Sequence, residues 1–287
     1  MIEIGKFNKL QVIRQVSHGF YLEGDEEWDD ILLPNKYAPE NLKVGDEIEV
    51  FIYFDSEDRI IATTQRPYAT VGEFASLEVS SVENIGVFLD WGLEKDLFVP
   101  FREKLFEMLP GQSYAVYIYI DSSNRIAAST RIKKYIDTSP APFAVGEKVD
   151  LLPYHSTDLG IKAIINGTHS GLIYHDDIVN DLKLGEFTQG YIKTLRDDNK
   201  VDLSLRPLGK ECRQDLVEQI ISKLKESGGS LAVTSKTPAN TINSMFQVSR
   251  NKFKIALGHL YKKKIISITD AGISLVSDKD SSRTQRV

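Results

Sequence analysis

The chain has 287 residues, with 35 basic and 41 acidic side chains, a formal net charge of −6 and a single cysteine, Cys212. One cysteine excludes an intramolecular disulfide framework and is typical of a reducing compartment. No run of about eighteen apolar residues predicts a membrane span, and the segment 1–10 lacks the apolar core of a secretion signal. We therefore expect a cytoplasmic globular protein without membrane contact.

The charge is unevenly distributed along the chain. Residues 1–71 hold 7 basic and 14 acidic side chains (−7), and residues 72–139 and 140–207 each hold 7 basic and 10 acidic ones (−3 each). Residues 208–276 hold 11 basic and 5 acidic side chains (+6), and residues 277–287 add +1. A basic segment indicates an anionic partner rather than a fold. The alternative is a basic domain whose lysines are merely solvated.

Three segments of the chain share one order of landmarks. Each contains an acidic turn, then a basic residue, then a short alternating strand, at Asp55–Pro67, Asp121–Ile132 and Arg196–Pro207. A glycine that opens an earlier strand recurs with offsets of 67 and 74 residues, at Gly19, Gly86 and Gly160. Other landmarks keep nearly the same offsets, which predicts a repeated structural unit.

Each unit contains five short strand patterns with alternating faces and Gly-bearing turns. Such patterns predict a small closed barrel of the OB type. We expect barrels over residues 1–66, 72–136 and 144–207, of which the first is acidic and the first two are degenerate. Short helical connections are expected at Asn35–Glu40, Phe101–Met108 and Asp176–Asp181.

After Pro207 the pattern becomes helical. One apolar stripe within 216–224 ends at Gly228-Gly229, Thr237-Pro238 opens a second helix, and Ser249 caps a third over Arg250–Lys263. The predicted buried face of the third helix consists of Phe253, Ala256, Leu257, Leu260 and Tyr261. A hairpin over 265–276 follows. Three helices closed by a hairpin are typical of a winged helix, expected over 208–276, and the polar segment 277–287 is expected to be disordered.

The predicted fold class is therefore mainly β with an α+β C-terminal domain: three tandem five-stranded OB-type barrels followed by a winged-helix domain. The order of a Gly-aromatic strand, a strand such as Leu97-Phe98-Val99-Pro100 and a closing Asp-x-x-x-Arg-Ile strand resembles the RNA-binding domain first described in ribosomal protein S-one. Copy three has the best form of the ending, Lys200–Leu205.

Three such barrels before a winged helix resemble the conserved virulence factor B family of bacterial RNA-binding regulators, over roughly residues 1–276. The resemblance implies a cytoplasmic RNA-binding protein that affects the expression of virulence genes and has no catalytic site of its own.

The sequence shows no catalytic motif, since it lacks a phosphate-binding loop, a dinucleotide fingerprint and a zinc-protease signature. His155, His169 and His175 lie near acidic residues in copy three, but no pair of His or Cys residues has metal-ligand spacing. We predict neither an enzyme nor a metal or cofactor site, and we interpret these histidines as surface residues near a nucleic-acid face.

An OB barrel binds RNA through flat aromatic faces for unpaired bases and cations along the phosphates. In barrel three the predicted RNA-binding residues are Lys162, Tyr174, His175, Lys193, Arg196, Lys200 and Arg206. In the winged helix they are Arg250, Lys252, Lys254, His259, Lys262 and Lys263. Phe88 and Arg125 of barrel two are weaker candidates. We predict one continuous surface for single-stranded RNA over barrel three and the winged helix, with barrels one and two as spacers or protein-contact modules.

Two aromatic pairs, Phe51/Tyr53 and Tyr117/Tyr119, together with Tyr191, are predicted to face away from the aliphatic barrel cores. Such rings could stack on bases or pack a barrel against its neighbour. Their presence in the acidic copies favours packing.

Two other interpretations of the function stay open. A DNA-binding winged-helix transcription regulator would prefer palindromic sites and dimerise, whereas we expect a monomer. A protein-binding scaffold would show weak salt dependence of any nucleic-acid binding.

Overall fold

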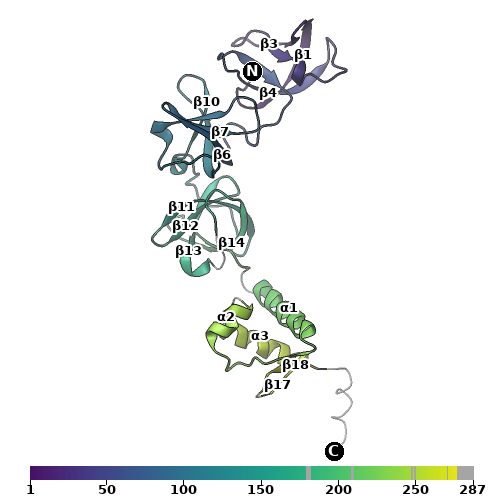
Figure 1. Cartoon of the computed structure of the whole chain (residues 1–287), viewed down its shortest axis with the longest axis vertical. Coiled ribbons are helices and arrows are strands. Elements are labelled where there is room, and N and C mark those ends of the chain that lie inside the picture. Colours follow the sequence, from purple (N-terminus) through teal and green to yellow (C-terminus); the bar gives the residue numbers. More distant parts are fainter. Residues whose placement is uncertain (179–181, 208–209, 247, 249, 270, 277–287) are drawn as a thin grey trace, which may run out of the picture.

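In a computed structural model of the chain, the described residues are 1–178, 182–207, 210–246, 248, 250–269 and 271–276, with only the backbone described for 210–215 and 239. Three closed five-stranded barrels follow one another, and a helical domain with a small sheet follows them (Figure 1). The predicted fold class is confirmed. The predicted cap at Ser249, the tail 277–287, the Cys212 side chain and the end of the connection Asp176–Asp181 lie outside the described residues.

The three barrels have the same strand order. Barrel one consists of β1 (Phe7–Val16), β2 (Gly19–Leu22), β3 (Ile31–Pro34), β4 (Glu47–Phe54) and β5 (Ile60–Thr63). Barrel two consists of β6 (Phe74–Glu83), β7 (Gly86–Asp90), β8 (Leu97–Pro100), β9 (Ser113–Ile120) and β10 (Ile126–Ser129). Barrel three consists of β11 (Lys148–Thr157), β12 (Gly160–Ile165), β13 (His169–Tyr174), β14 (Thr188–Leu195) and β15 (Val201–Ser204). In each, the third and fifth strands pair in parallel and the other pairs are antiparallel, as in an OB barrel.

The turn before the last strand has the same geometry in all three barrels. A left-handed residue with φ of 58° precedes the basic residue each time, at Asp58, Asn124 and Asn199. Asp and Asn adopt this conformation more readily than other non-glycine residues. The turn closes through a backbone hydrogen bond of 2.9 Å to the carbonyl of Arg59, Arg125 or Lys200. The repeat read from the acidic turns is therefore present in the structure.

The predicted helical connections are in the right places but shorter than expected. Each is a single 3₁₀ turn, at Asn35–Tyr37, Phe101–Glu103 and His175–Asp177. The residue that ends each turn returns to an extended backbone, with ψ between 113° and 134°. The prediction of longer helices is therefore wrong, because the backbone becomes extended after three residues.

Barrels one and two share a hydrophobic core through the outward-facing pair Phe51 and Tyr53. Both side chains are buried among residues of barrel two, and the ring centroid of Phe51 lies 5.7 Å from that of Trp91. Burial raises the pKa of the Tyr53 hydroxyl. The packing interpretation of this pair is confirmed.

The second aromatic pair packs within barrel two and its C-terminal connection. Tyr117 stacks on Tyr135 with ring centroids 4.0 Å apart, and Tyr119 lies 5.8 Å from the same ring. These rings are therefore used for packing as well, whereas Tyr191 is half-buried on β14.

Barrels two and three meet through a smaller apolar contact. Its buried residues are Ala115 and Ile132 before barrel three, and Leu152 and Ile164 within it. Gly185 lies at the edge of this contact with φ of +80°, where a Cβ atom would come within 2.5 Å of the Ser113 carbonyl oxygen. Only glycine permits so close an approach with this backbone conformation.

The C-terminal domain is built from α1 (Lys210–Glu226), β16 (Ser230–Leu231), α2 (Ala239–Phe246), α3 (Arg250–Lys262), β17 (Ile266–Ile268) and β18 (Ile273–Leu275). Its sheet has the order β16-β18-β17. Helix α1 ends where Gly229 donates its backbone N–H to the Leu224 carbonyl at 2.7 Å, as the glycine pair predicts. Among the described residues, no helix is long and apolar enough to cross a membrane.

The predicted buried face of α3 is correct except at one position. Phe253, Ala256, Leu257 and Leu260 are buried, but Tyr261 is 57% exposed. Tyr261 lies about 80° around the helix from Phe253, at 100° per residue, and so falls beyond the apolar stripe.

The shared core of barrels one and two generates a stability prediction. Phe51→Ala should lower the free energy of unfolding by about 3–5 kcal/mol, because it empties a fully buried site between the two barrels. Phe187→Ala is the matched control, since Phe187 is 64% exposed. Urea unfolding followed by tryptophan fluorescence measures both changes, and equal losses in the two variants would contradict the assignment.

A buried carboxylate generates a second prediction. Glu103 accepts hydrogen bonds from Ser129 Oγ at 2.7 Å and from Lys134 Nζ at 3.3 Å. Burial alone would raise the pKa of Glu103, but the hydrogen bonds from Ser129 and Lys134 outweigh burial and lower it. A lowered folded pKa adds stability above the unfolded value of about 4.3, and this stability is lost as the pH falls through the folded pKa.

Glu103→Gln should therefore make the free energy of unfolding less sensitive to acid below about pH 4.3. Urea unfolding at a series of pH values between neutrality and acid tests this. Glu107→Gln, at an exposed position of the same barrel, is the control and should keep the acid dependence of the parent chain. An unchanged acid dependence in Glu103→Gln would refute the role of this carboxylate.

Candidate nucleic-acid interface

Strand pairing places one residue from each of four neighbouring strands in a row across the outer face of barrel three. His155 on β11 pairs with Lys162 on β12, which in turn pairs with Leu172 on β13. Leu172 pairs with Asp202 on β15. His155 is exposed and the other three are half-buried, so the row faces outward.

Tyr174 is the last residue of β13, beside this row, and two of the predicted cations contact it. Its hydroxyl oxygen accepts a hydrogen bond from Arg196 Nη2, and Lys193 Nζ lies 5.7 Å from its ring centroid. Arg196 also pairs with both carboxylate oxygens of Asp202, at 3.0 Å from Nε and 2.9 Å from Nη2. Hydrogen bonding to Asp202 raises the pKa of Arg196. The structure thus brings Tyr174, Lys193 and Arg196 together around one aromatic ring.

Two of the predicted cations have carboxylate partners of different exposure. Lys193 Nζ lies 2.5 Å from the half-buried Asp177 Oδ2, and Lys200 Nζ lies 2.5 Å from the exposed Asp198 Oδ2. A solvent-exposed pair such as Lys200–Asp198 contributes on the order of 0–1 kcal/mol. A phosphate can therefore replace Asp198 as the partner of Lys200 at little cost.

Lys162 lies near two other lysines. Burial lowers the pKa of Lys162, and the positive charges of Lys133 and Lys200 lower it further. Among the described carboxylates, none lies within 4.0 Å of Lys162 or Lys133. Lys133 is not among the predicted site residues, and it lies after the last strand of barrel two, on the 3₁₀ helix Ile132–Lys134. The signal in the sequence is the lysine doublet directly after barrel two.

The remaining predicted residues of barrel three lie at its edges. His175 is exposed at the start of its 3₁₀ turn, with Nε2 3.0 Å from the Thr157 carbonyl oxygen. Arg206 follows β15, where its backbone N–H donates to Ser204 Oγ at 3.1 Å. His169 does not belong to a nucleic-acid face, contrary to the expectation for the three histidines. It is buried, and its ring packs edge-on against Phe143 at 5.4 Å.

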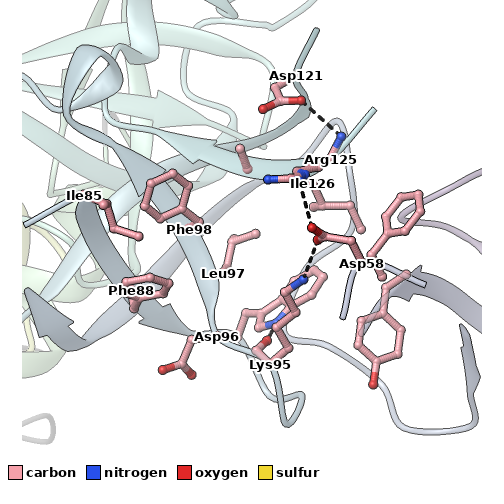
Figure 2. Close-up of a pocket in the computed structure, with 14 residues that line it drawn as sticks. Asp58, Ile85, Phe88, Lys95, Asp96, Leu97, Phe98, Asp121, Arg125 and Ile126 are labelled. Carbon is pink, nitrogen blue, oxygen red and sulfur yellow. Dashed lines mark hydrogen bonds and ion pairs between the residues drawn. The ribbon is translucent and has the colours of Figure 1, made fainter. Parts of the chain in front are cut away.

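Barrel two presents a different surface at the equivalent positions. The register equates Phe88 with Lys162, Phe98 with Leu172 and Arg125 with Lys200. Phe88 and Phe98 lie with ring centroids 5.3 Å apart in a pocket of about 280 Å³, next to the exposed Ile85 (Figure 2).

Arg125 is engaged by barrel one. Its Nη2 donates to Asp58 Oδ2 at 2.7 Å, and Lys95 Nζ lies 3.5 Å from Asp58 Oδ1 (Figure 2). Of the two weaker candidates, Phe88 therefore lines a pocket that a ligand could enter. The charge of Arg125 is instead compensated by Asp58 of barrel one.

The predicted cations of the winged helix are exposed on and directly after α3. Arg250, Lys252, Lys254, His259, Lys262 and Lys263 are all exposed. Arg250 Nε donates to the Ser235 carbonyl oxygen at 3.0 Å, which fixes the start of α3 against the preceding loop. Ile255 and Tyr261 are exposed on the same helix. The hydrophobic cores of barrel three and the winged helix are separate.

Within the part of the chain whose side chains are described, no group of three or more His, Cys, Asp or Glu residues is arranged to hold a metal ion.

Comparison with known proteins adds family information to this geometry. Residues 4–65 and 71–131 match the family model of the S1 domain, and residues 218–275 match that of the CvfB-like winged helix domain. The Bacillus subtilis protein YitL, which is named as uncharacterized, is 28% identical over 269 residues, covering 88% of this chain and 87% of that protein. Conserved virulence factor B of Staphylococcus epidermidis is 26% identical over 281 residues, covering 95% and 94%. A crystal structure of a multidomain protein with nucleic acid binding domains from Streptococcus pneumoniae is 21% identical, with a TM-score of 0.46, and covers 95% of this chain and 98% of that one.

The S1 matches fall on barrels one and two, which were expected to be the degenerate copies, and barrel three repeats their strand order. The winged-helix match covers most of α1 and the elements up to β18. Both kinds of domain are nucleic-acid-binding folds. The chain therefore contains two S1 domains and a CvfB-like winged helix domain, and most of its length is similar to conserved virulence factor B.

Proposed function

We propose that this protein is a non-enzymatic, cytoplasmic and monomeric RNA-binding regulator of gene expression that holds single-stranded RNA on barrel three and the winged helix. The observation that carries the proposal is the outer face of barrel three, where Tyr174 is flanked by Lys193 and Arg196. A half-buried aromatic ring with cations beside it matches a nucleotide, which offers a flat base and a phosphate. Base–aromatic stacking contributes about 1–3 kcal/mol per base, and phosphate neutralisation adds a salt-dependent term.

The turn before the last strand supports the choice of barrel three. In barrels one and two this turn begins with Asp55 and Asp121, whose carboxylates accept backbone hydrogen bonds within the turn. In barrel three Arg196 begins the same turn. The acidic residue is thus replaced by a basic one in the copy that presents Tyr174.

The basic residue of the turn supports the same choice. Arg59 of barrel one pairs with Asp55 at 2.7 Å and with Glu57 at 2.8 Å, so two carboxylates surround it. Lys200, its counterpart, has one carboxylate partner among the described residues and lies near Lys162. Barrels one and two then act as spacers or protein-contact modules, joined to barrel three by packing.

The winged helix supports a second candidate function. Winged helices place their third helix in the major groove of duplex DNA, and α3 here exposes several basic residues. The major groove of A-form RNA is too narrow for a helix, so RNA binding would use phosphates and shape instead. The name of the staphylococcal relatives also makes a role in virulence gene expression part of the proposal.

Charge reversal at equivalent turn positions tests the role of barrel three. Lys200→Glu should lower the affinity of the full chain for single-stranded RNA by about tenfold and reduce its salt slope by about 0.7, because one phosphate contact is lost. Arg59→Glu, at the matched position of barrel one, should change neither value appreciably. Fluorescence anisotropy at several salt concentrations measures both, and equal losses at the two positions would contradict the division of labour.

A second pair of variants separates RNA from DNA as the ligand of the winged helix. Lys254→Glu on α3 should weaken binding of single-stranded RNA several-fold, whereas Lys225→Glu on the exposed face of α1 should not. Titrations of the unmodified chain and both variants with single-stranded RNA and with duplex DNA, at two salt concentrations, make the comparison. Preference of the unmodified chain for duplex DNA, with the loss in Lys254→Glu confined to DNA, would favour the transcription regulator.

A further inference from the structure

A groove of about 730 Å³ lies where barrel two and its C-terminal connection meet barrel three. Its walls come from the segment after the 3₁₀ turn of barrel two, from the 3₁₀ helix Ile132–Lys134 and from β11. The volume lies in the range of sites that hold small ligands, about 300–1,000 Å³. This groove borders the outer face of barrel three, and Tyr174 is not among its lining residues.

The groove is cationic although barrel two as a whole is acidic. Arg131, Lys133 and Lys134 line it, and Glu103 is its one acidic lining residue. Glu103 is already engaged by Lys134 and by Ser129. Lys133 has no carboxylate within 4.0 Å among the described residues. The groove therefore has an excess of positive charge that the protein itself does not balance.

The groove also offers flat side chains beside these cations. Phe106 is partly exposed on one wall, and its ring centroid lies 5.6 Å from that of Tyr114. Tyr154 and His155 also line the groove, and their rings lie nearly parallel, with an angle of 25° between their planes. The Tyr154 hydroxyl is placed 3.1 Å from Ser170 Oγ, which holds the ring in position. Aromatic faces beside unpaired cations fit a base and its phosphate.

The groove is continuous with the face of barrel three. His155 lines the groove and is also the first residue of the row that continues through Lys162. Lys133 in the groove and Lys200 near the face both lie close enough to Lys162 to lower its pKa. Cations thus lie beside the ring of Tyr174 and in the groove, and Lys162 lies near both Lys200 and Lys133.

We infer that this groove is a second subsite for the same single-stranded RNA, in which Lys133 and Arg131 bind a phosphate while Phe106 or the Tyr154–His155 pair stacks on an unpaired base. The inference rests on the proposed function, because the strand must first occupy barrel three. It assigns RNA binding to the junction between barrels two and three. Neither a single S1 domain nor the winged helix forms this junction by itself.

Anisotropy titrations of the full chain with a fluorescein-labelled oligouridylate of about 20 nucleotides test the inference, since one OB fold covers about 4–16 nucleotides. Lys133→Glu and Phe106→Ala should each weaken binding roughly tenfold, and Lys133→Glu should also reduce the salt slope. Lys148→Glu is the matched control, because Lys148 is exposed at the opposite end of β11 from His155. Circular dichroism of each variant checks that the fold is retained.

A second measurement reports on the groove directly. Ultraviolet cross-linking of the unmodified chain to a 4-thiouridine oligonucleotide, followed by mass spectrometry, should attach the RNA to a peptide that contains Phe106 or Tyr154. Normal binding by both groove variants, together with loss of binding in Lys200→Glu, would overturn the assignment of the groove as an RNA subsite and leave the proposed function intact. Absence of RNA binding by the unmodified chain would overturn both.

Discussion

Burial of outward-facing side chains is the interaction on which the arrangement of the three barrels depends. A five-stranded barrel fills its interior with inward side chains, so an apolar residue on its outer face needs a neighbour. Phe51 packs against Trp91 of barrel two, and Ile164 packs against Ile132. The contacts use particular outer positions and leave other rows open. Packing between barrels therefore decides which polar faces remain available for a ligand.

Much of the fold was predictable because it depends on local patterns. The turns at Asp58, Asn124 and Asn199 recur with one geometry, and strand alternation and a constant offset are visible within short windows of sequence. The errors arise where long-range packing decides. His169 is buried against Phe143, and Tyr261 lies just beyond a stripe that the helical period describes only approximately. Lys133 could not be connected with Lys162 from the sequence, since their proximity depends on how barrel three docks on barrel two.

Net charge per domain is a poor guide to where an anion can bind. Barrels two and three have the same net charge of −3 on residues 72–139 and 140–207, yet their equivalent positions differ. Arg125 is compensated by Asp58 from another barrel, and its counterpart Lys200 pairs with Asp198 of its own turn. Lys162, at the position of Phe88, has no carboxylate partner among the described residues. The local pairing of each cation determines the field that a phosphate would experience, because exposed charges beyond about 8–10 Å are largely screened in physiological salt.

The short connection between barrel three and the winged helix has a consequence for avidity. Strand β15 ends at Ser204 and α1 begins at Lys210, so five residues, 205–209, join the two domains. Such a segment spans at most about 20 Å even when fully extended. An RNA strand bound to barrel three would encounter the winged helix at an effective concentration in the millimolar range. Under the proposed function, two RNA sites joined in this way would act as one stronger site, and lengthening the linker would weaken the combined affinity without changing a single contact.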